Sequence, residues 1–222
     1  METKESLQNL KPTAGEAYNL GWRQMFKYFL YAFLVIVVLG IIQAPVGWTR
    51  EVNDIHFPVM FSFFTIFSLA FYIFVAAPIK YGAYKVFLNI IRGGEIEMKE
   101  LFYGFKDYIN IVLANILMMA IIGIGIVFLI VPGIIFACRL AFVPYLVIDK
   151  KMEAVKAVEE SWKMTRGYGW TIFLMALMVI PIGIAGLLCL GVGVIFSIIW
   201  VNLAFAAIYA IVAARKEIPE SV

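Results

Sequence analysis

One arginine within a long apolar stretch is the residue of this chain best suited to chemistry. Residues 108–148 form a run of 41 residues with a single charge, that of Arg139. A guanidinium has planar donors that match carboxylate and phosphate oxygens, and it stays charged at physiological pH. An ionised group in an apolar segment is costly and by default suggests a functional site. Two interpretations follow. Either Arg139 binds an anionic ligand, or it is structural and extends its charged end to the membrane interface.

Four polar side chains in other apolar segments could meet Arg139. Ser62 and Thr65 belong to a series of hydroxyl residues spaced by three or four positions, which places them on one helical face. Ser197 lies in the last apolar segment at a similar predicted depth, and Asn202 lies about one turn deeper. These four residues and Arg139 form the candidate anion- or lipid-binding set. The alternative is that the hydroxyl and amide groups only hold helices together.

The chain lacks the sequence signatures of common enzymes. It contains no phosphate loop, no nucleophile elbow and no metal-binding helix motif. Its single histidine, His56, and its two cysteines, Cys138 and Cys189, do not provide a metal-ligand set. We therefore expect a non-enzymatic protein with no catalytic residue, metal, cofactor or nucleic-acid partner.

Composition places these residues in an integral membrane protein. The chain has 222 residues, of which 64% are hydrophobic, compared with about 45–50% in soluble domains. Its apolar segments approach the roughly 20 residues needed to cross a bilayer. They predict an all-α fold, with one transmembrane domain over residues 1–222 and six spans at 26–43, 58–79, 109–131, 133–148, 170–190 and 192–213.

Basic residues are divided very unevenly between the two sides of such a membrane. With six spans, sixteen of the 18 Lys and Arg residues fall on one side, Arg50 falls on the other, and Arg139 lies within a span. In multi-pass membrane proteins, the side with the excess of Lys and Arg is the cytoplasmic side. We therefore expect a multi-pass protein of the cell membrane with both termini in the cytoplasm and the 44–57 loop outside. Arg139 would then lie about 9 Å from the outer end of the fourth span and lean outward.

The connections between spans indicate how the spans pair. Very short turns after the third and fifth spans predict antiparallel hairpins, and a weak threefold repeat predicts three hairpins in all. Residues 95–106 and 149–166 are amphipathic and are predicted to lie along the cytoplasmic membrane surface. In the second of these segments, the apolar arc consists of Ala154, Val155, Val158 and Trp162.

The stretch from residue 131 to 170 resembles a known family. The matching elements are Pro132-Gly133, Arg139, Pro144, residues 157–161, Thr165-Arg166-Gly167 and, upstream, Gly82, Arg92-Gly93 and Leu101-Phe102. The pattern resembles the polytopic membrane region found with glycerophosphoryl diester phosphodiesterases and in related stand-alone, uncharacterised bacterial membrane proteins. The resemblance implies a six-span helical membrane domain of bacterial or archaeal origin. It does not imply phosphodiesterase activity, which in that family belongs to a separate soluble domain.

Two functions are compatible with these features. The first is a non-enzymatic membrane module that scaffolds a partner or acts in envelope maintenance, and we favour it because no polar pathway crosses the predicted spans. The second is transport or binding of an anionic or lipid-like substrate at a pocket around Arg139. The expected partners are the lipid bilayer, an anionic lipid, and a membrane protein or a second copy of the chain.

Overall fold

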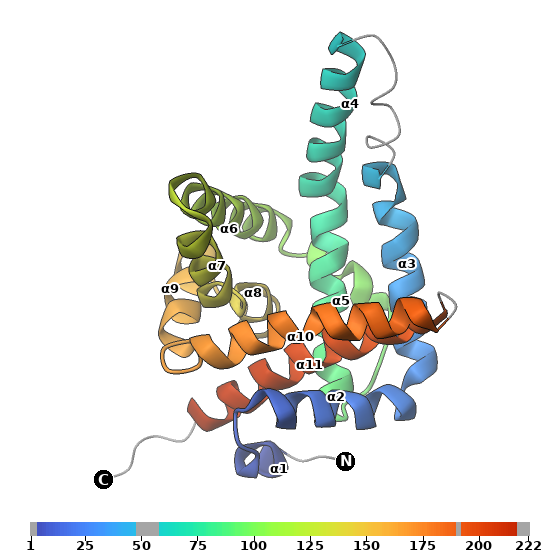
Figure 1. Ribbon diagram of the computed structural model, residues 1–222, viewed down its shortest axis with the longest axis vertical. Coiled ribbons are helices and arrows are strands. Elements are labelled where there is room, and N and C mark those ends of the chain that lie inside the picture. Colours follow the sequence, from blue (N-terminus) through green and yellow to red (C-terminus); the bar gives the residue numbers. More distant parts are fainter. Residues whose placement is uncertain (1–3, 48–57, 190–191, 217–222) are drawn as a thin grey trace.

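The chain folds into helices throughout the part that the structure describes. The structure is a computed structural model that describes residues 4–47, 58–189 and 192–216. All regular elements in these ranges are helical, which confirms the predicted all-α class. In chain order they are α1 (Lys4–Asn9), α2 (Ala14–Lys27), α3 (Phe29–Gly47), α4 (Pro58–Phe71), the π-helix η2 (Tyr72–Ala76), α5 (Ala77–Arg92), the 3-10 helix η3 (Met98–Phe105), α6 (Tyr108–Phe128), α7 (Ile130–Arg139), α8 (Val143–Lys150), α9 (Ala154–Met164), α10 (Gly169–Leu188) and α11 (Val192–Lys216) (Figure 1).

Several of these helices have the length and composition of membrane spans. Within the described ranges, five helical stretches are long and apolar enough to cross a membrane, and some of them join consecutive helices. They are Thr65–Arg92, Tyr108–Phe128, Ile130–Lys150, Gly169–Leu188 and Gly193–Lys216. The pair α2 and α3 would make a sixth, although the chain bends by 98° between them. These features are those of a membrane protein.

The second predicted span is the first part of a longer helical rod. α4, η2 and α5 follow one another without a break from Pro58 to Arg92, and Figure 1 shows them as one long vertical rod. The prediction ended this span at residue 79, next to Pro78, and assigned Lys80 to the following loop. The helix instead ends at Gly93, whose φ of 65° gives the left-handed turn that commonly ends helices.

The fourth predicted span is two helices. α7 ends at Arg139, and α8 begins at Val143. α7 also begins earlier than predicted, directly after the extended residue Leu129. The turn brings α6 and α7 so close that a Cβ on Gly125 would lie 2.9 Å from the Gly133 Cα.

A similar close approach joins α10 and α11. A Cβ on Gly193 would lie 3.0 Å from the Gly186 Cα, so small residues are required where these two helices meet. The connection from α3 to α4 runs through residues 48–57, which lie outside the described ranges.

The most deeply buried part of the molecule lies where α5 packs against α8 and α11, and where α2 crosses α11. Phe87, Leu146 and Tyr209 are inaccessible to solvent there. Gly21 of α2 approaches α11 so closely that a Cβ on it would lie 2.9 Å from the Ala204 nitrogen. In Figure 1, α2, α10 and α11 run across the lower half of the α4–α5 rod. The alanine-rich face of α11 allows this close crossing.

Large apolar side chains are exposed on the other parts of the long helices. Val127 and Phe128 at the end of α6 are 86% and 78% exposed, and Leu188 at the end of α10 is 79% exposed. Such a surface suits contact with lipid chains rather than water.

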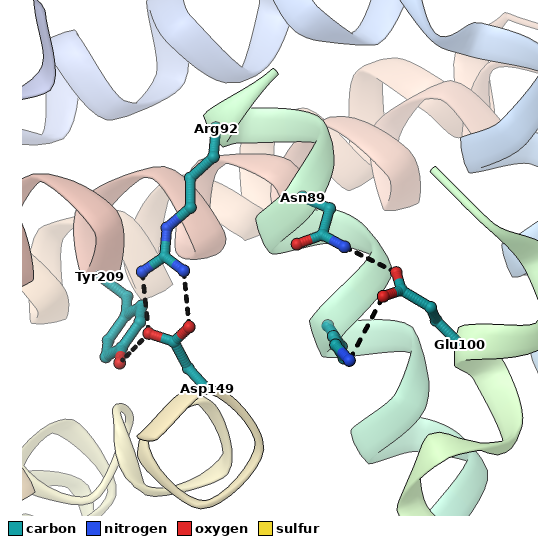
Figure 2. Close-up of polar contacts among 6 residues, drawn as sticks. Asn89, Arg92, Glu100, Asp149 and Tyr209 are labelled. Carbon is teal, nitrogen blue, oxygen red and sulfur yellow. Dashed lines mark hydrogen bonds and ion pairs between the residues drawn. The ribbon is translucent and has the colours of Figure 1, made fainter. Parts of the chain in front are cut away.

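A charged cluster joins α5 to α8 and α11. The Arg92 guanidinium donates to both Asp149 carboxylate oxygens, with Nη1–Oδ1 at 2.5 Å and Nη2–Oδ2 at 2.8 Å. The Tyr209 hydroxyl donates to Asp149 Oδ2 at 2.9 Å. Figure 2 shows the carboxylate of Asp149 held between these two side chains. The pair connects residues that the sequence places far apart and satisfies the partly buried carboxylate.

A second polar cluster holds η3 against α5. The Asn89 amide donates to Glu100 Oε2 at 2.6 Å (Figure 2), and Lys85 Nζ lies 3.3 Å from Glu100 Oε1. At Gly82, a Cβ would overlap the carbonyl oxygen of Leu101. Residues 98–105 are therefore packed tightly on α5 as a 3-10 helix.

Candidate anion-binding site at Arg139

Arg139 is the last residue of α7, and α9 holds its backbone in place. Ser161 Oγ donates to the Arg139 carbonyl oxygen at 2.7 Å, and the Thr165 hydroxyl lies 3.3 Å from the same oxygen. These contacts satisfy a carbonyl at a helix end, where no intrahelical donor is available. The Trp162 ring faces the guanidinium, with its centroid 5.8 Å from Arg139 Cζ, within the range of a cation–π interaction.

α9 packs against the protein through its small side chains. Ala154, Ala157 and Ser161 are buried, whereas Val155 and Trp162 of the predicted apolar arc are 56% and 41% exposed. The packing face therefore includes Ala154 of the predicted apolar arc, whereas Val155 and Trp162 of the same arc lie largely outside it. The small side chains let α9 approach α6 and α8 closely.

Asn110 of α6 fixes the beginning of α9. Its Oδ1 accepts a hydrogen bond from the Ala154 N–H at 2.7 Å, and its Nδ2 donates to the Met152 carbonyl at 2.8 Å. The amide thus caps a helix whose own N-cap residue, Glu153, makes no side-chain capping bond. α9 is fixed at both ends, by Asn110 and by Arg139.

An apolar cleft of about 530 Å³ opens between α7 and the start of α10. This volume lies in the range of small-molecule pockets, roughly 300–1,000 Å³. Among the described residues that line the cleft, Arg139 alone is charged. The other walls include Val131, Ile134, Ile135, Cys138, Trp170 and Phe173.

One guanidinium nitrogen of Arg139 is not satisfied by the protein. Nη1 is buried and has no hydrogen-bond partner among the described residues, which is unfavourable for a charged donor. α10 begins next to it, since a Cβ on Gly169 would lie 4.0 Å from Arg139 Cζ. Tyr168, the N-cap residue of α10, makes no side-chain capping bond. A carboxylate or phosphate oxygen beside Arg139 could accept a charge-assisted hydrogen bond from the guanidinium.

These contacts change the predicted depth of Arg139. The sequence placed Arg139 near the outer end of its span, and residues 149–166 at the inner surface. In the structure Arg139 contacts α9 and lies beside Gly169, where the next candidate span begins. The two predictions are therefore incompatible. Arg139 lies at the level of the α9–α10 junction because α7 ends at Arg139 and α9 folds back to meet it.

The other predicted site residues lie elsewhere. Ser197 donates to the Ile182 carbonyl at 3.0 Å and lines a different cleft, between α10 and α11. Asn202 donates to a carbonyl one turn earlier in its own helix. Thr65 is exposed on α4, the helix that also contains Ser62. The structure thus groups Arg139 with none of the three whose side chains it describes. The Ser197 bond joins α11 to α10, whereas the Asn202 bond stays within α11.

Lys80 is a candidate functional residue that the sequence interpretation assigned to a loop. It lies in α5 and lines a second cavity, of about 350 Å³, together with Tyr72, Tyr84 and Asn115. The positions 72, 80 and 84 differ by multiples of four, so a helix continuing past residue 79 would have placed them on one face. Among the described residues, no group of three or more His, Cys, Asp or Glu side chains is placed to hold a metal ion.

Comparison with known proteins gives a family match over the second half of the chain. Residues 118–216 match a family described as "Protein of unknown function (DUF975)". No curated protein and no solved structure was found to match. The family match fits the expected resemblance to an uncharacterised family, whereas no link to glycerophosphoryl diester phosphodiesterases is shown. Less than half of the chain is covered, and this part includes Arg139, α9 and the cleft between α7 and α10.

Proposed function

We propose that this protein is a multi-pass membrane protein that binds an anionic amphipathic molecule, such as a lipid with a phosphate or carboxylate group, in the Arg139 cleft. The observation that carries the proposal is the buried Nη1 of Arg139, which has no protein partner among the described residues and belongs to a side chain that lines an apolar cleft. An anionic oxygen would supply the missing acceptor. The apolar walls would accommodate an attached hydrocarbon chain.

The position of the protein in the membrane is part of this proposal. We place six spans in three hairpins, with α2 and α3 together forming the first span. The uneven distribution of Lys and Arg supports a cell-membrane location with both termini in the cytoplasm. α9 and η3 would then lie on the cytoplasmic side, so the Arg139 cleft would open toward the inner leaflet. Anionic headgroups at that surface attract basic groups.

The proposal concerns binding or transport and not catalysis, in keeping with the absence of enzyme motifs from the sequence. Scaffolding of a membrane partner, or a role in envelope maintenance, was the function that the sequence favoured. No contact in the described part of the chain favours scaffolding over ligand binding.

Lipid analysis of the purified protein tests this function. Wild type, Arg139→Gln and Arg166→Gln would be purified in the same mild detergent, and their bound lipids identified by mass spectrometry. Arg166 is a matched control because it is exposed and close in sequence. Wild type and Arg166→Gln should retain an anionic lipid. Arg139→Gln should lose about tenfold or more of it, because one charge-assisted hydrogen bond contributes roughly 1.5–3 kcal/mol.

The thermal stability of the same samples separates a ligand role of Arg139 from a structural one. Arg139→Gln should fold and keep nearly the stability of wild type after both have been stripped of lipid. A wild-type protein that carries no anionic lipid would refute the function. So would an Arg139→Gln protein that is less stable but keeps as much lipid as wild type.

A further inference from the structure

A mainly apolar cavity that contains several polar side chains lies between α5 and α6, apart from the Arg139 cleft. It has a volume of about 350 Å³ and is lined by Lys80, three tyrosines and the amide of Asn115. Its remaining walls are mainly apolar and include Met118 and Ile122. The π-helix η2 contributes Tyr72 to its edge, and such segments within α-helices are frequent at functional sites.

Lys80 differs from the other cations of α5 in its partners. Lys85 pairs with Glu100 at 3.3 Å, and Arg92 pairs with Asp149. In the described part of the chain, Lys80 has no carboxylate within ion-pair distance. The groups that interact with its ammonium are Tyr72 and Tyr84, with Nζ 5.9 Å from the centroid of the Tyr84 ring. An ammonium held in a candidate membrane span by neutral groups alone is incompletely compensated.

The neighbouring donors are also weakly satisfied. The Tyr81 hydroxyl donates to the Met118 sulfur at 3.9 Å, and the Asn115 amide donates to the Met119 sulfur at 3.7 Å. Thioether sulfur is a weak acceptor. The cavity therefore presents one positive charge and several hydrogen-bond donors, without any acidic side chain among the described residues that line it.

We propose that this cavity is a second anion-binding site, which takes a carboxylate or phosphate group attached to a small apolar body. The oxygens of such a group would accept hydrogen bonds from Lys80 and from the amide of Asn115. The apolar part would lie along α6 against Met118 and Ile122. The site does not depend on the Arg139 proposal, since it has different lining residues.

Binding of small probes to the full-length protein tests the site. The protein would be reconstituted in nanodiscs of zwitterionic phosphatidylcholine and titrated with butyrate or inorganic phosphate, with uncharged butanol as the chemical control. Wild type should show saturable binding and a rise in Tm with at least one anion, and no response to butanol. Lys80→Met should weaken the binding about tenfold or more, through loss of a charge-assisted hydrogen bond.

Lys27→Met is the matched protein control. Lys27 also places its Nζ near a tyrosine ring, 5.2 Å from the centroid of Tyr28, but it is exposed and lines none of the described cavities. It should bind the anion as wild type does. If Lys80→Met does not fold, Asn115→Leu takes its place, because Asn115 is only half-buried. Asn115→Leu should weaken the same binding severalfold.

A lipid could supply the anionic group instead of a soluble molecule. Nanodiscs that contain phosphatidylglycerol, analysed by native mass spectrometry, distinguish this source. Retention by wild type and Lys27→Met, with loss in Lys80→Met, would identify a lipid headgroup. If butyrate, phosphate and phosphatidylglycerol all fail to distinguish wild type from the cavity variants, the site is refuted. The same titrations with Arg139→Gln show whether the Lys80 cavity binds the anion without the Arg139 cleft. Loss of binding at one site and not at the other would refute only the corresponding proposal.

Discussion

At the scale of single residues, the partners of each cation separate structural charges from candidate binding groups. The guanidinium of Arg92 donates two hydrogen bonds to the carboxylate of Asp149. Arg139 has a satisfied backbone carbonyl and faces an aromatic ring, yet one of its guanidinium nitrogens has no acceptor in the described part of the chain. Among the described residues, the groups that interact with the Lys80 ammonium are tyrosines, Tyr72 and Tyr84. A cation whose partners are complete stabilises the fold, whereas an incomplete one has capacity left for a ligand.

Removal of the Arg92 charge should destabilise the protein. Arg92→Met leaves the Asp149 carboxylate, whose side chain is 17% exposed, with only the Tyr209 hydroxyl of the contacts described above. We expect the free energy of unfolding to fall by about 2 kcal/mol, less than for a completely buried pair because Arg92 is partly exposed. Denaturation in detergent would measure the loss.

An exposed ion pair provides the control for this change. Lys156 pairs with Glu153 at 3.0 Å, and both side chains are more than 70% exposed. Lys156→Met should have no measurable effect, because solvent screens such a pair. Equal losses from Arg92→Met and Lys156→Met would show that the Arg92–Asp149 pair does not hold α5 against α8.

At the scale of helices, close approaches between backbones determine which elements can pack. α5 and η3 meet at Gly82 and Gly104, where a Cβ would overlap carbonyl oxygens of the other element. α9 similarly uses Ala157 and Ser161 to approach its neighbours. These small residues position α5 and α9, which contribute Lys80 and the contacts to Arg139.

A methyl group at Gly82 should disrupt the packing of η3 on α5. Gly82→Ala would force the Leu101 backbone to move, and we expect a loss of about 2 kcal/mol in the free energy of unfolding. Gly40→Ala on α3 is the control, because nothing lies within 4 Å of a Cβ built there. That change should be neutral or stabilise by up to about 1 kcal/mol through helix propensity. Similar effects of the two changes, measured by the same denaturation assay, would contradict the close contact.

At the scale of the whole molecule, the contacts of Arg139 connect its depth to the membrane topology. Arg139 lies at the junction of α9 and α10. If α9 is cytoplasmic, the cleft opens toward the inner leaflet. The opposite orientation would place it at the outer leaflet, so topology determines which lipids the cleft can reach.

Thiol labelling of intact cells with a membrane-impermeant maleimide tests the proposed orientation. Cys189 is exposed at the end of α10, on the predicted outer side, and Cys138 is buried. Wild type should be labelled in intact cells, and Cys189→Ser should not. Lys156→Cys in the Cys189→Ser background should be labelled only after permeabilisation. If the new thiol on α9 were labelled in intact cells, the orientation of the protein would be opposite to the proposed one.

The candidate site was predictable only in part. Arg139 could be identified from the sequence because a lone charge in 41 residues needs no structure to be noticed. Its partners could not, because Ser161 and Thr165 reach it from a helix that folds back more than twenty residues later. Lys80 was missed because a charge near the end of an apolar segment is usually a loop residue, whereas here the helix continues to Arg92.

The sequence by itself determined the helical class and the approximate number and position of the membrane-compatible segments. These properties depend on the local density of apolar residues, which can be read directly from the sequence. The tertiary structure decided that α7 ends at Arg139, that α9 closes against it, and that Lys80 and Asn115 share a cavity. Such groupings depend on helix crossings and backbone approaches between distant residues, and a periodic pattern along one chain does not encode which faces meet.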